Sequence, residues 1–549
     1  MSALRPLPTP LRRLVHAGWP WLVLAAILLV CAVNVGAWVD RNGLPDGFQN
    51  ESIHVRNAMD LWQAWVERDS YTLGQVARTY YWPPGFYAWP IPLYAAMGAS
   101  HAAMVTANLG HLAVLLVACY LLGSALSDRA GGVLAAGLVV LYPSIFGNLV
   151  RFEPNVAVTA WVTLGTYCLL KSRGFADRRW SLLFGLACGV GLLMDRLSLA
   201  VFLALPGAVV ALSALRRPSR GRGLLNASLA VGALLAVAGW WLWSFYQVNL
   251  QELLDQGGVG EIDAAGTWTE QRDPTALATW LYYVTVLLDE QAGILPGAAA
   301  LAGVAAALAS RTRRRQRLVP VLVVVAAVGL FTLVAKKQVY YTIPILGCLA
   351  ALTAAWLRSL GARGWGLAVV VLLAGIHQAG WRVWERGLPL PGPVAAALGD
   401  QVLPASWTDR RHVQARPPRN LELPIDQMAR AVGGGSVVVV SEDATWPEGF
   451  VVLHLRERLP GVWVRGMSND PEGTYEQARF AEAVVWVTPQ EDAGWPTLDA
   501  LEGILINDNY ALEHLPPVAD TLASLEDRFG VGGRWALPYG GSAVVFRAR

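Results

Sequence analysis

Long apolar stretches recur along the first 384 residues and constrain this chain more than any other feature. A transmembrane α-helix needs roughly 20 apolar residues in succession, and 54% of the 549 residues are hydrophobic while only 15% are charged. The chain is therefore predicted to be an α-helical polytopic membrane protein with about 11 transmembrane helices. The predicted spans are residues 18–38, 103–123, 130–148, 154–171, 180–195, 197–215, 224–246, 291–309, 318–335, 339–357 and 364–382.

The charges in the loops between these spans predict the topology. Lys and Arg stay on the cytoplasmic side of a membrane, and the strongly basic loops all fall on that side if the N-terminus is cytoplasmic. They include "RRPSRGRG" from Arg216 and "RTRRRQR" from Arg311, whereas the loop at 247–274 falls outside and carries six acidic residues. An odd number of spans then places the C-terminal part outside. We expect a multi-pass protein of a bacterial-type inner membrane.

The last third of the chain differs in charge and is predicted to be a soluble extracytoplasmic α/β domain. Residues 386–549 carry 14 basic and 21 acidic residues, against 29 and 19 in residues 1–385. We divide the chain into a transmembrane domain at 1–384 and this domain at 385–549. Its predicted elements are short strands in "SVVVVSED" and "AEAVVWVTP", a helix in "TYEQARFAE" and a closing hairpin in "WALPYGGSAVVFRAR".

The loop after the first predicted span, residues 39–100, is unusually long and rich in polar and aromatic residues. Loops of this length often carry function. Apolar and charged residues interleave between Ile53 and Val66, as in a helix that lies in the membrane interface. Glu51 and His54 would share a face of that helix, and a carboxylate beside an imidazole suits a general base or a metal-ligand pair. Such a pair in a loop can equally be without function.

Other histidines lie in or beside the predicted spans. They are interpreted as packed or hydrogen-bonded side chains and not as metal ligands. These residues are His101, His111 and His377.

Four segments carry a resemblance to a known family. In chain order they are "NESIHVRNAMDLW" from Asn50, "YYWPPGFYAWPIPLYAAMG" from Tyr80, "YPSIFGNLVRFEPN" from Tyr142 and "KKQVYYTIP" from Lys336. Their order and spacing resemble the polytopic GT-C glycosyltransferases. These enzymes use sugars linked to polyprenyl phosphate, and they include aminoarabinose transferases and protein O-mannosyltransferases.

The resemblance implies roles for individual residues. Glu51 matches the catalytic carboxylate and Glu153 matches a second acid. The donor phosphate end is implied for four residues of one segment, namely Lys336, Lys337, Tyr340 and Tyr341.

The chain departs from the family pattern at two places. Asn50 stands where relatives commonly have Asp, so the base remains open between Glu51 and Asp46. Many relatives have a Leu-Thr-Lys-like stretch at the place where this chain has Met194, Asp195 and Arg196. The position or the role of the cationic side chain therefore differs from the family pattern there.

Charged residues from separate loops fall at the same predicted outer face. Charges at a membrane boundary are costly and usually have a partner or a function. Transfer of a sugar from a lipid phosphate requires a base for the acceptor hydroxyl and cations for the departing phosphate. Ordinary helix-end ion pairs and snorkelling lysines are the alternative explanation. The residues are Asp40, Asp46, Glu51, Arg151, Glu153, Asp195, Arg196, Lys336 and Lys337, of which Arg151 and Arg196 are further candidates for the donor phosphate.

We thus expect a hexosyl- or pentosyltransferase, and the resemblance to the GT-C glycosyltransferases implies that it inverts the anomeric configuration. Its partners would be the lipid bilayer, a polyprenyl-phosphate-linked sugar donor and a lipid, glycan or protein acceptor on the extracytoplasmic face. A divalent cation, Mg²⁺ or Mn²⁺, is a candidate cofactor, with Glu51 and Glu153 as its ligands. A nucleic-acid partner is excluded because the basic residues form no extended patch. The alternatives are a flippase or transporter of lipid-linked glycans and a membrane scaffold without catalytic activity.

The loop-charge topology makes a prediction about accessibility. Protease added to intact spheroplasts should remove the residues after about position 390, because the predicted outer side exposes them. Immunoblots against an N-terminal and a C-terminal tag would report the cleavage. Full protection of the C-terminal tag would contradict the topology.

Overall fold

The computed structural model describes most of the helical part of the chain and the strands of a C-terminal sheet. The described residues are 9–42, 49–68, 70, 73–74, 82–195, 200–215, 220–257, 270–271, 277–310, 314–333, 336–384, 422–441, 451, 455, 458–459, 462–466, 481–488, 529–536 and 542–549.

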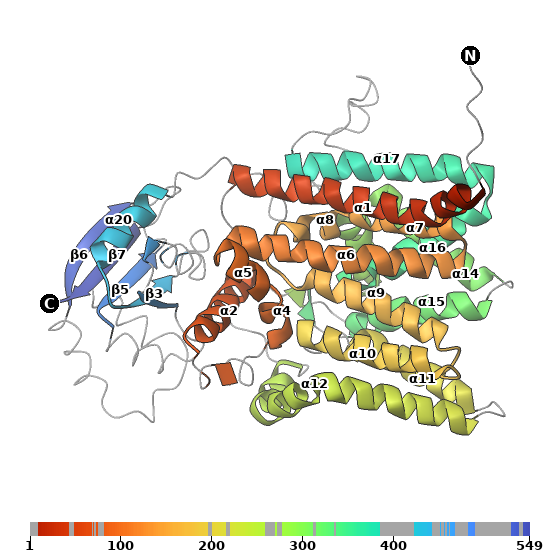
Figure 1. Cartoon of the computed structure of the whole chain (residues 1–549), viewed down its shortest axis with the longest axis horizontal. Coiled ribbons are helices and arrows are strands. Elements are labelled where there is room, and N and C mark those ends of the chain that lie inside the picture. Colours follow the sequence, from red (N-terminus) through yellow and green to blue (C-terminus); the bar gives the residue numbers. More distant parts are fainter. Residues whose placement is uncertain are drawn as a thin grey trace, which may run out of the picture.

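Most of the helices run side by side in one bundle, with their axes roughly parallel (Figure 1). Short π-helices and a 3-10 helix interrupt or extend some of them. The bundle elements are α1 (Thr9–Asn42), α6 (His101–Leu126), α7 (Arg129–Val140), α8 (Pro143–Leu149), α9 (Asn155–Lys171), α10 (Arg178–Met194), η1 (Ala200–Ala204), α11 (Leu205–Leu215), α12 (Arg220–Gly257), α13 (Leu277–Val286), η2 (Leu287–Gln291), α14 (Ile294–Ala309), α15 (Arg314–Leu333), η3 (Ile343–Ile345), α16 (Leu346–Ser359) and α17 (Ala362–Trp384).

Several of these helices can cross a membrane. Among the described residues, five are long and apolar enough, and the bent pair of α7 and α8 makes a sixth if it counts as one span. Shorter apolar helices lie at Val201–Ala214, Ile294–Ala309 and Ile343–Ser359. The predicted class of α-helical polytopic membrane protein is confirmed. The number of about 11 spans stays a prediction.

A proline turns the chain between α7 and α8, which meet at an angle of 66°. Tyr142 has an extended backbone with ψ of 123°, and Pro143 opens α8. Proline disfavours the helical conformation in the residue before it, and it suits the first position of a new helix. The turn directs the chain into the short connection at 150–154, which leads to α9.

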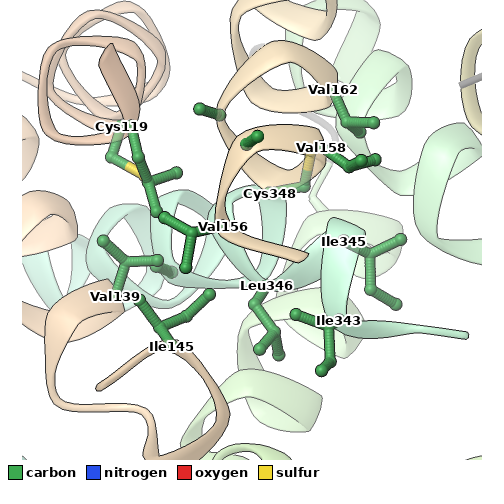
Figure 2. Packing of buried hydrophobic residues seen from close by; sticks show 14 of the residues in the cluster. Cys119, Val139, Ile145, Val156, Val158, Val162, Ile343, Ile345, Leu346 and Cys348 are labelled. Atoms are coloured by element: carbon green, nitrogen blue, oxygen red, sulfur yellow. The ribbon is translucent and has the colours of Figure 1, made fainter. Parts of the chain in front are cut away.

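The largest hydrophobic core extends through most of the bundle, and part of it lies between α6, α9 and α16. Figure 2 shows buried residues from this part, among them Cys119 of α6, Val158 and Val162 of α9, and Ile345 and Leu346. In a bilayer such contacts stabilise helix association through close packing and not through exclusion of water. This core fixes the start of α9 and, with it, the connection at 150–154.

Three helices of the segment between α1 and α6 lie together at one end of the bundle (Figure 1). They are α2 (Gln49–Val66), α4 (Pro84–Ala88) and α5 (Ile91–Met97). Val55 and Met59 of α2 are buried, while Trp65 and Val66 at its end are each 57% exposed. The helix predicted over 53–66 is confirmed, and its exposed apolar end fits a membrane interface.

The C-terminal part contains a five-stranded sheet of order β4-β3-β5-β7-β6. Strands β3, β4 and β5 are parallel, and β6 and β7 form an antiparallel hairpin joined to β5. The elements are α20 (Glu422–Val432), β3 (Ser436–Ser441), β4 (Trp463–Gly466), β5 (Ala483–Thr488), β6 (Phe529–Ala536) and β7 (Ser542–Ala548).

The sheet has a small core of its own, in which Met428 of α20 packs against Val437, Val485 and Val545. The two predicted strands and the closing hairpin are confirmed. Of the helix predicted at 474–482, residues 474–480 lie outside the described residues, and Ala481 and Glu482 are not helical. The boundary at 384 and 385 stays a prediction. Figure 1 shows the sheet beyond the end of the bundle that carries α2, α4 and α5.

An ion pair joins two loops that the charge pattern assigns to the cytoplasmic side. Arg358 at the end of α16 donates from Nη2 to Oδ2 of Asp128 at 2.6 Å, and Asp128 also caps the start of α7. The guanidinium lowers the pKa of this carboxyl group below its ordinary value. The contact requires both loops to lie at the same end of the bundle, in agreement with the predicted topology.

The close contact between α10 and α12 yields a prediction. A Cβ atom at Gly185 would overlap the backbone carbonyl of Ala230, whereas one at Gly232 would meet nothing within 4 Å. Gly185→Ala should therefore separate the two helices and destabilise the protein by about 1–3 kcal/mol. Thermal unfolding in detergent measures this, with Gly232→Ala as the control. Equal melting temperatures for both variants would contradict the packing.

Candidate functional site

The carboxylate of Glu51 is the centre of the candidate site. It lies in the first turn of α2 and is completely buried. Its Oε1 atom accepts the backbone N–H of Phe152 at 2.8 Å and lies 3.3 Å from Nε2 of His101. Its Oε2 atom has no hydrogen-bond partner in the described part of the chain. Two groups thus hold Oε1, whereas Oε2 keeps its capacity to accept a hydrogen bond or a proton.

His101 contacts this carboxylate from the first residue of α6. The side chain of Ser100 caps the helix by accepting the N–H of Ala103 at 3.2 Å. The imidazole is only 2% exposed, and its Nδ1 atom has no partner among the described residues. Because a carboxylate accepts hydrogen bonds, we assign the proton of the ring to Nε2.

The connection between α8 and α9 brings Glu153 to the same place. Asn108 of α6 donates to the carbonyl of Arg151 at 2.6 Å. Asn155 donates to Oε2 of Glu153 at 2.8 Å, and Nη1 of Arg151 lies 3.8 Å from Oε1 of Glu153. The neighbouring residue, Phe152, donates to Glu51, so the connection that carries Glu153 contacts Glu51 although 102 positions separate the two acids in the sequence.

The hydrogen-bond partner of His54 is Tyr87 and not Glu51. Its Nδ1 atom lies 2.8 Å from the hydroxyl of Tyr87 in α4, and Asn57 donates to the same hydroxyl at 3.2 Å. Burial raises the pKa of Tyr87 far above its ordinary value, so the hydroxyl keeps its proton and donates it to His54. This triad joins α2 to α4, whereas the sequence suggested that His54 would act together with Glu51.

The segment predicted to bind the donor phosphate lies in a second interruption of the bundle helices, between α15 and α16. Lys336 and Lys337 form β2, which pairs with β1 (Glu270–Gln271) so that Glu270 stands opposite Lys337. The side chains of the two lysines lie outside the described part of the structure. Tyr341 stacks on Phe331 of α15 and meets Tyr340 edge to face.

Two further candidates, Asp46 and Arg196, lie outside the described residues. Asp40 is exposed near the end of α1, and Asp195 follows α10 as its C-terminal cap.

The residues present do not form a complete metal site. In the part of the chain that the structure describes, no three His, Cys, Asp or Glu side chains are grouped so as to hold a metal ion. Oε1 of Glu51 is already held by Phe152 and His101, and Oε2 of Glu153 is held by Asn155. A hard divalent cation takes about six oxygen ligands. The described geometry therefore does not support the predicted cation, and the chemistry below uses none.

Comparisons with known proteins identify the fold. No family model and no curated protein matches this chain in sequence. Among solved structures, ArnT from Cupriavidus metallidurans in the apo state has a TM-score of 0.59 at 15% identity and covers 97% of this chain and 98% of its own. The chain has the GT-C fold.

Two other structures agree with this assignment. ArnT bound to undecaprenyl phosphate has a TM-score of 0.58 at 14% identity over 96% of this chain and 98% of its own. The apo oligosaccharyltransferase of Archaeoglobus fulgidus has a TM-score of 0.50 at 10% identity over 85% of this chain and 69% of its own. At such identities the likeness establishes the GT-C fold alone.

Sequence reasoning missed His101 as a partner of the site. It is hydrogen-bonded, as expected, but its partner is the candidate base. The serine cap directly before it marks the start of a helix. Nothing in the sequence shows that this helix start lies beside residue 51, since only the GT-C fold brings the two together.

The triad at Tyr87 yields a prediction about stability. Tyr87→Phe leaves His54 and Asn57 buried without this partner, so it should destabilise the protein by about 1–3 kcal/mol. Tyr94→Phe is the matched control, because the buried hydroxyl of Tyr94 has no partner among the described residues. Thermal unfolding in detergent should show a lower melting temperature for Tyr87→Phe only. A larger loss in Tyr94→Phe would contradict the network.

Proposed function

We propose that this protein is a membrane glycosyltransferase. It moves one sugar from a polyprenyl-phosphate donor to a hydroxyl group of a lipid, glycan or protein acceptor on the extracytoplasmic face. The observation that carries the proposal is the match to ArnT, one structure of which holds undecaprenyl phosphate, over nearly the full length of both chains. The hydrogen-bonding of Glu51 supports it independently of the fold.

In the proposed reaction Glu51 is the general base. Its Oε2 atom accepts the proton of the acceptor hydroxyl as that oxygen attacks the anomeric carbon of the sugar. A bond forms between the acceptor oxygen and this carbon, and the bond from the carbon to the phosphate oxygen breaks. A single displacement of this kind inverts the anomeric configuration. Because Oε2 is buried, side chains around it have to move when the acceptor enters.

Cations take up the charge on the departing polyprenyl phosphate in this proposal. Arg151 lies one residue from the N–H that holds Glu51, and its guanidinium is suited to phosphate geometry. The resemblance to the GT-C glycosyltransferases also implies Lys336 and Lys337 for the phosphate, and Arg196 is a further candidate. Glu153 orients Arg151 through their contact at 3.8 Å.

A transporter of lipid-linked glycans fits these observations less well. Intramembrane charges that form a transport path lie along the helices and near the bilayer centre. Here the buried charged residues Glu51, Arg151 and Glu153 gather at one end of α2, α6 and α9. A scaffold without catalytic activity would not need a buried carboxylate with one unpartnered oxygen, which is costly to fold around.

Replacement of Glu51 tests the proposal. Glu51→Gln keeps the size of the side chain and removes its basicity, so turnover should fall by roughly 10²- to 10⁴-fold while donor binding changes little. The assay uses purified protein in lipid vesicles with a panel of undecaprenyl-phosphate-linked sugars, and it measures released undecaprenyl phosphate. Glu67→Gln, an exposed acid directly after α2, is the matched control.

Asp46→Asn is the necessary companion variant, because Asn50 stands where GT-C relatives commonly have Asp. Full activity in Glu51→Gln and none in Asp46→Asn would assign the base to Asp46 and keep the class of enzyme. Full activity in both variants would leave the reaction without a base and reject the mechanism. Absence of turnover in the wild type with every sugar, together with glycan movement across vesicles, would favour the transporter.

A further inference from the structure

We propose that His101 is the positioning residue for Glu51, and that it directs Oε2 of this carboxylate toward the acceptor hydroxyl. The inference rests on the proposed function, since it assigns a role within the same reaction. It comes from the contact of His101 Nε2 with Glu51 Oε1 at 3.3 Å, in which both side chains are buried.

The two donors to Glu51 act on the same oxygen. The N–H of Phe152 and the N–H of His101 both point at Oε1, at 2.8 Å and 3.3 Å. Hydrogen bonds to an ionised group are stronger than neutral ones, and they stabilise the negative charge on the atom that accepts them. The proton from the substrate is therefore expected at Oε2, the atom without a partner among the described residues. With one donor lost, the carboxylate could rotate and present either oxygen.

His101 is well placed to hold this orientation. It belongs to the first turn of α6, where the cap by Ser100 and the bond from Asn108 to the carbonyl of Arg151 fix the helix against the connection at 150–154. Helix α6 therefore carries His101 itself, and it positions Phe152 through the bond from Asn108 to the preceding residue, Arg151. Loss of the imidazole removes one of the two contacts and leaves the other.

Packing alone does not explain a histidine at this position. Its Nδ1 atom is buried without a partner among the described residues, and such an atom costs folding free energy. An apolar side chain of similar size would avoid that cost. His111 stacks on Trp89 at a centroid distance of 4.5 Å, and neither of its ring nitrogens has a partner among the described residues, so the feature that distinguishes His101 is the contact of its Nε2 atom with Glu51.

Two variants of His101 separate its hydrogen bond from its volume. His101→Leu removes the donor, and kcat should fall by about 10- to 100-fold, the range expected for a lost hydrogen bond to a charged group. KM for the undecaprenyl-phosphate-linked donor should stay within about twofold, because the proposed role of His101 is to orient Glu51 and involves no contact with the donor. His101→Gln places an N–H near the position of Nε2 and should restore most of kcat. His377→Leu, on α17, is the control for loss of an imidazole.

A double-mutant cycle tests whether His101 acts through Glu51. In the Glu51→Gln background, His101→Leu should cause little further loss of turnover, because the base that it orients is absent. Additive losses would overturn the inference and would indicate a separate role for His101. Unchanged kcat in His101→Leu would overturn it as well.

A spectroscopic measurement tests the contact without any substrate. The infrared difference spectrum between wild type and Glu51→Gln isolates the carboxylate bands of Glu51. These bands should shift in the His101→Leu background and keep their position in His101→Gln. Unshifted bands in His101→Leu would reject the inference even if the protein is a glycosyltransferase, whereas a shift together with absent turnover in the wild type would reject only the proposed function.

Discussion

The bilayer requires that backbone N–H and C=O groups find partners within the protein, and the whole fold depends on this constraint. A lipid-facing segment satisfies it only as a helix, and irregular backbone is tolerated only where protein surrounds it. The breaks in this structure follow the rule. The connection at 150–154 between α8 and α9 is buried, and Asn108 donates to the carbonyl of Arg151 within it. In the irregular segment that follows β2, the side chain of Gln291 donates to the backbone carbonyl of Val339 at 2.5 Å.

These breaks are also where the functional groups lie. A continuous helix uses its N–H groups internally, whereas a broken one has N–H groups to spare. The N–H of Phe152 is available to Glu51 because α8 has ended and α9 has not begun. Pro143 turns the chain between α7 and α8, and the short helix α8 then leads into this connection. The element that interrupts the bundle therefore also supplies the donor that holds the candidate base.

Two buried histidines near Glu51, His54 and His101, have different hydrogen-bond partners and therefore different roles. His54 is joined to a hydroxyl that burial keeps protonated, and the triad with Asn57 holds α2 against α4. His101 is joined to a carboxylate instead. The first network fixes the helix that carries Glu51, and the second fixes the carboxylate itself. Together they hold a buried acid in one orientation, which a general base requires.

The sequence by itself determined the membrane class, the order of the helices and the strands of the C-terminal sheet, because each depends on the periodicity of apolar residues close together in the chain. The charges at the predicted membrane boundary included Glu51 and Glu153, and the resemblance to the GT-C glycosyltransferases selected these two as candidate acids. The sequence did not predict which residues form hydrogen bonds with these side chains or with those beside them in the chain. His54 is close to Glu51 in sequence but bonds to Tyr87, whereas His101 and Phe152, which are 50 and 101 positions away, hold its carboxylate. Only the packing of α2, α6 and α9 decided this, because hydrogen bonds between distant residues follow from the arrangement of helices and not from local pattern.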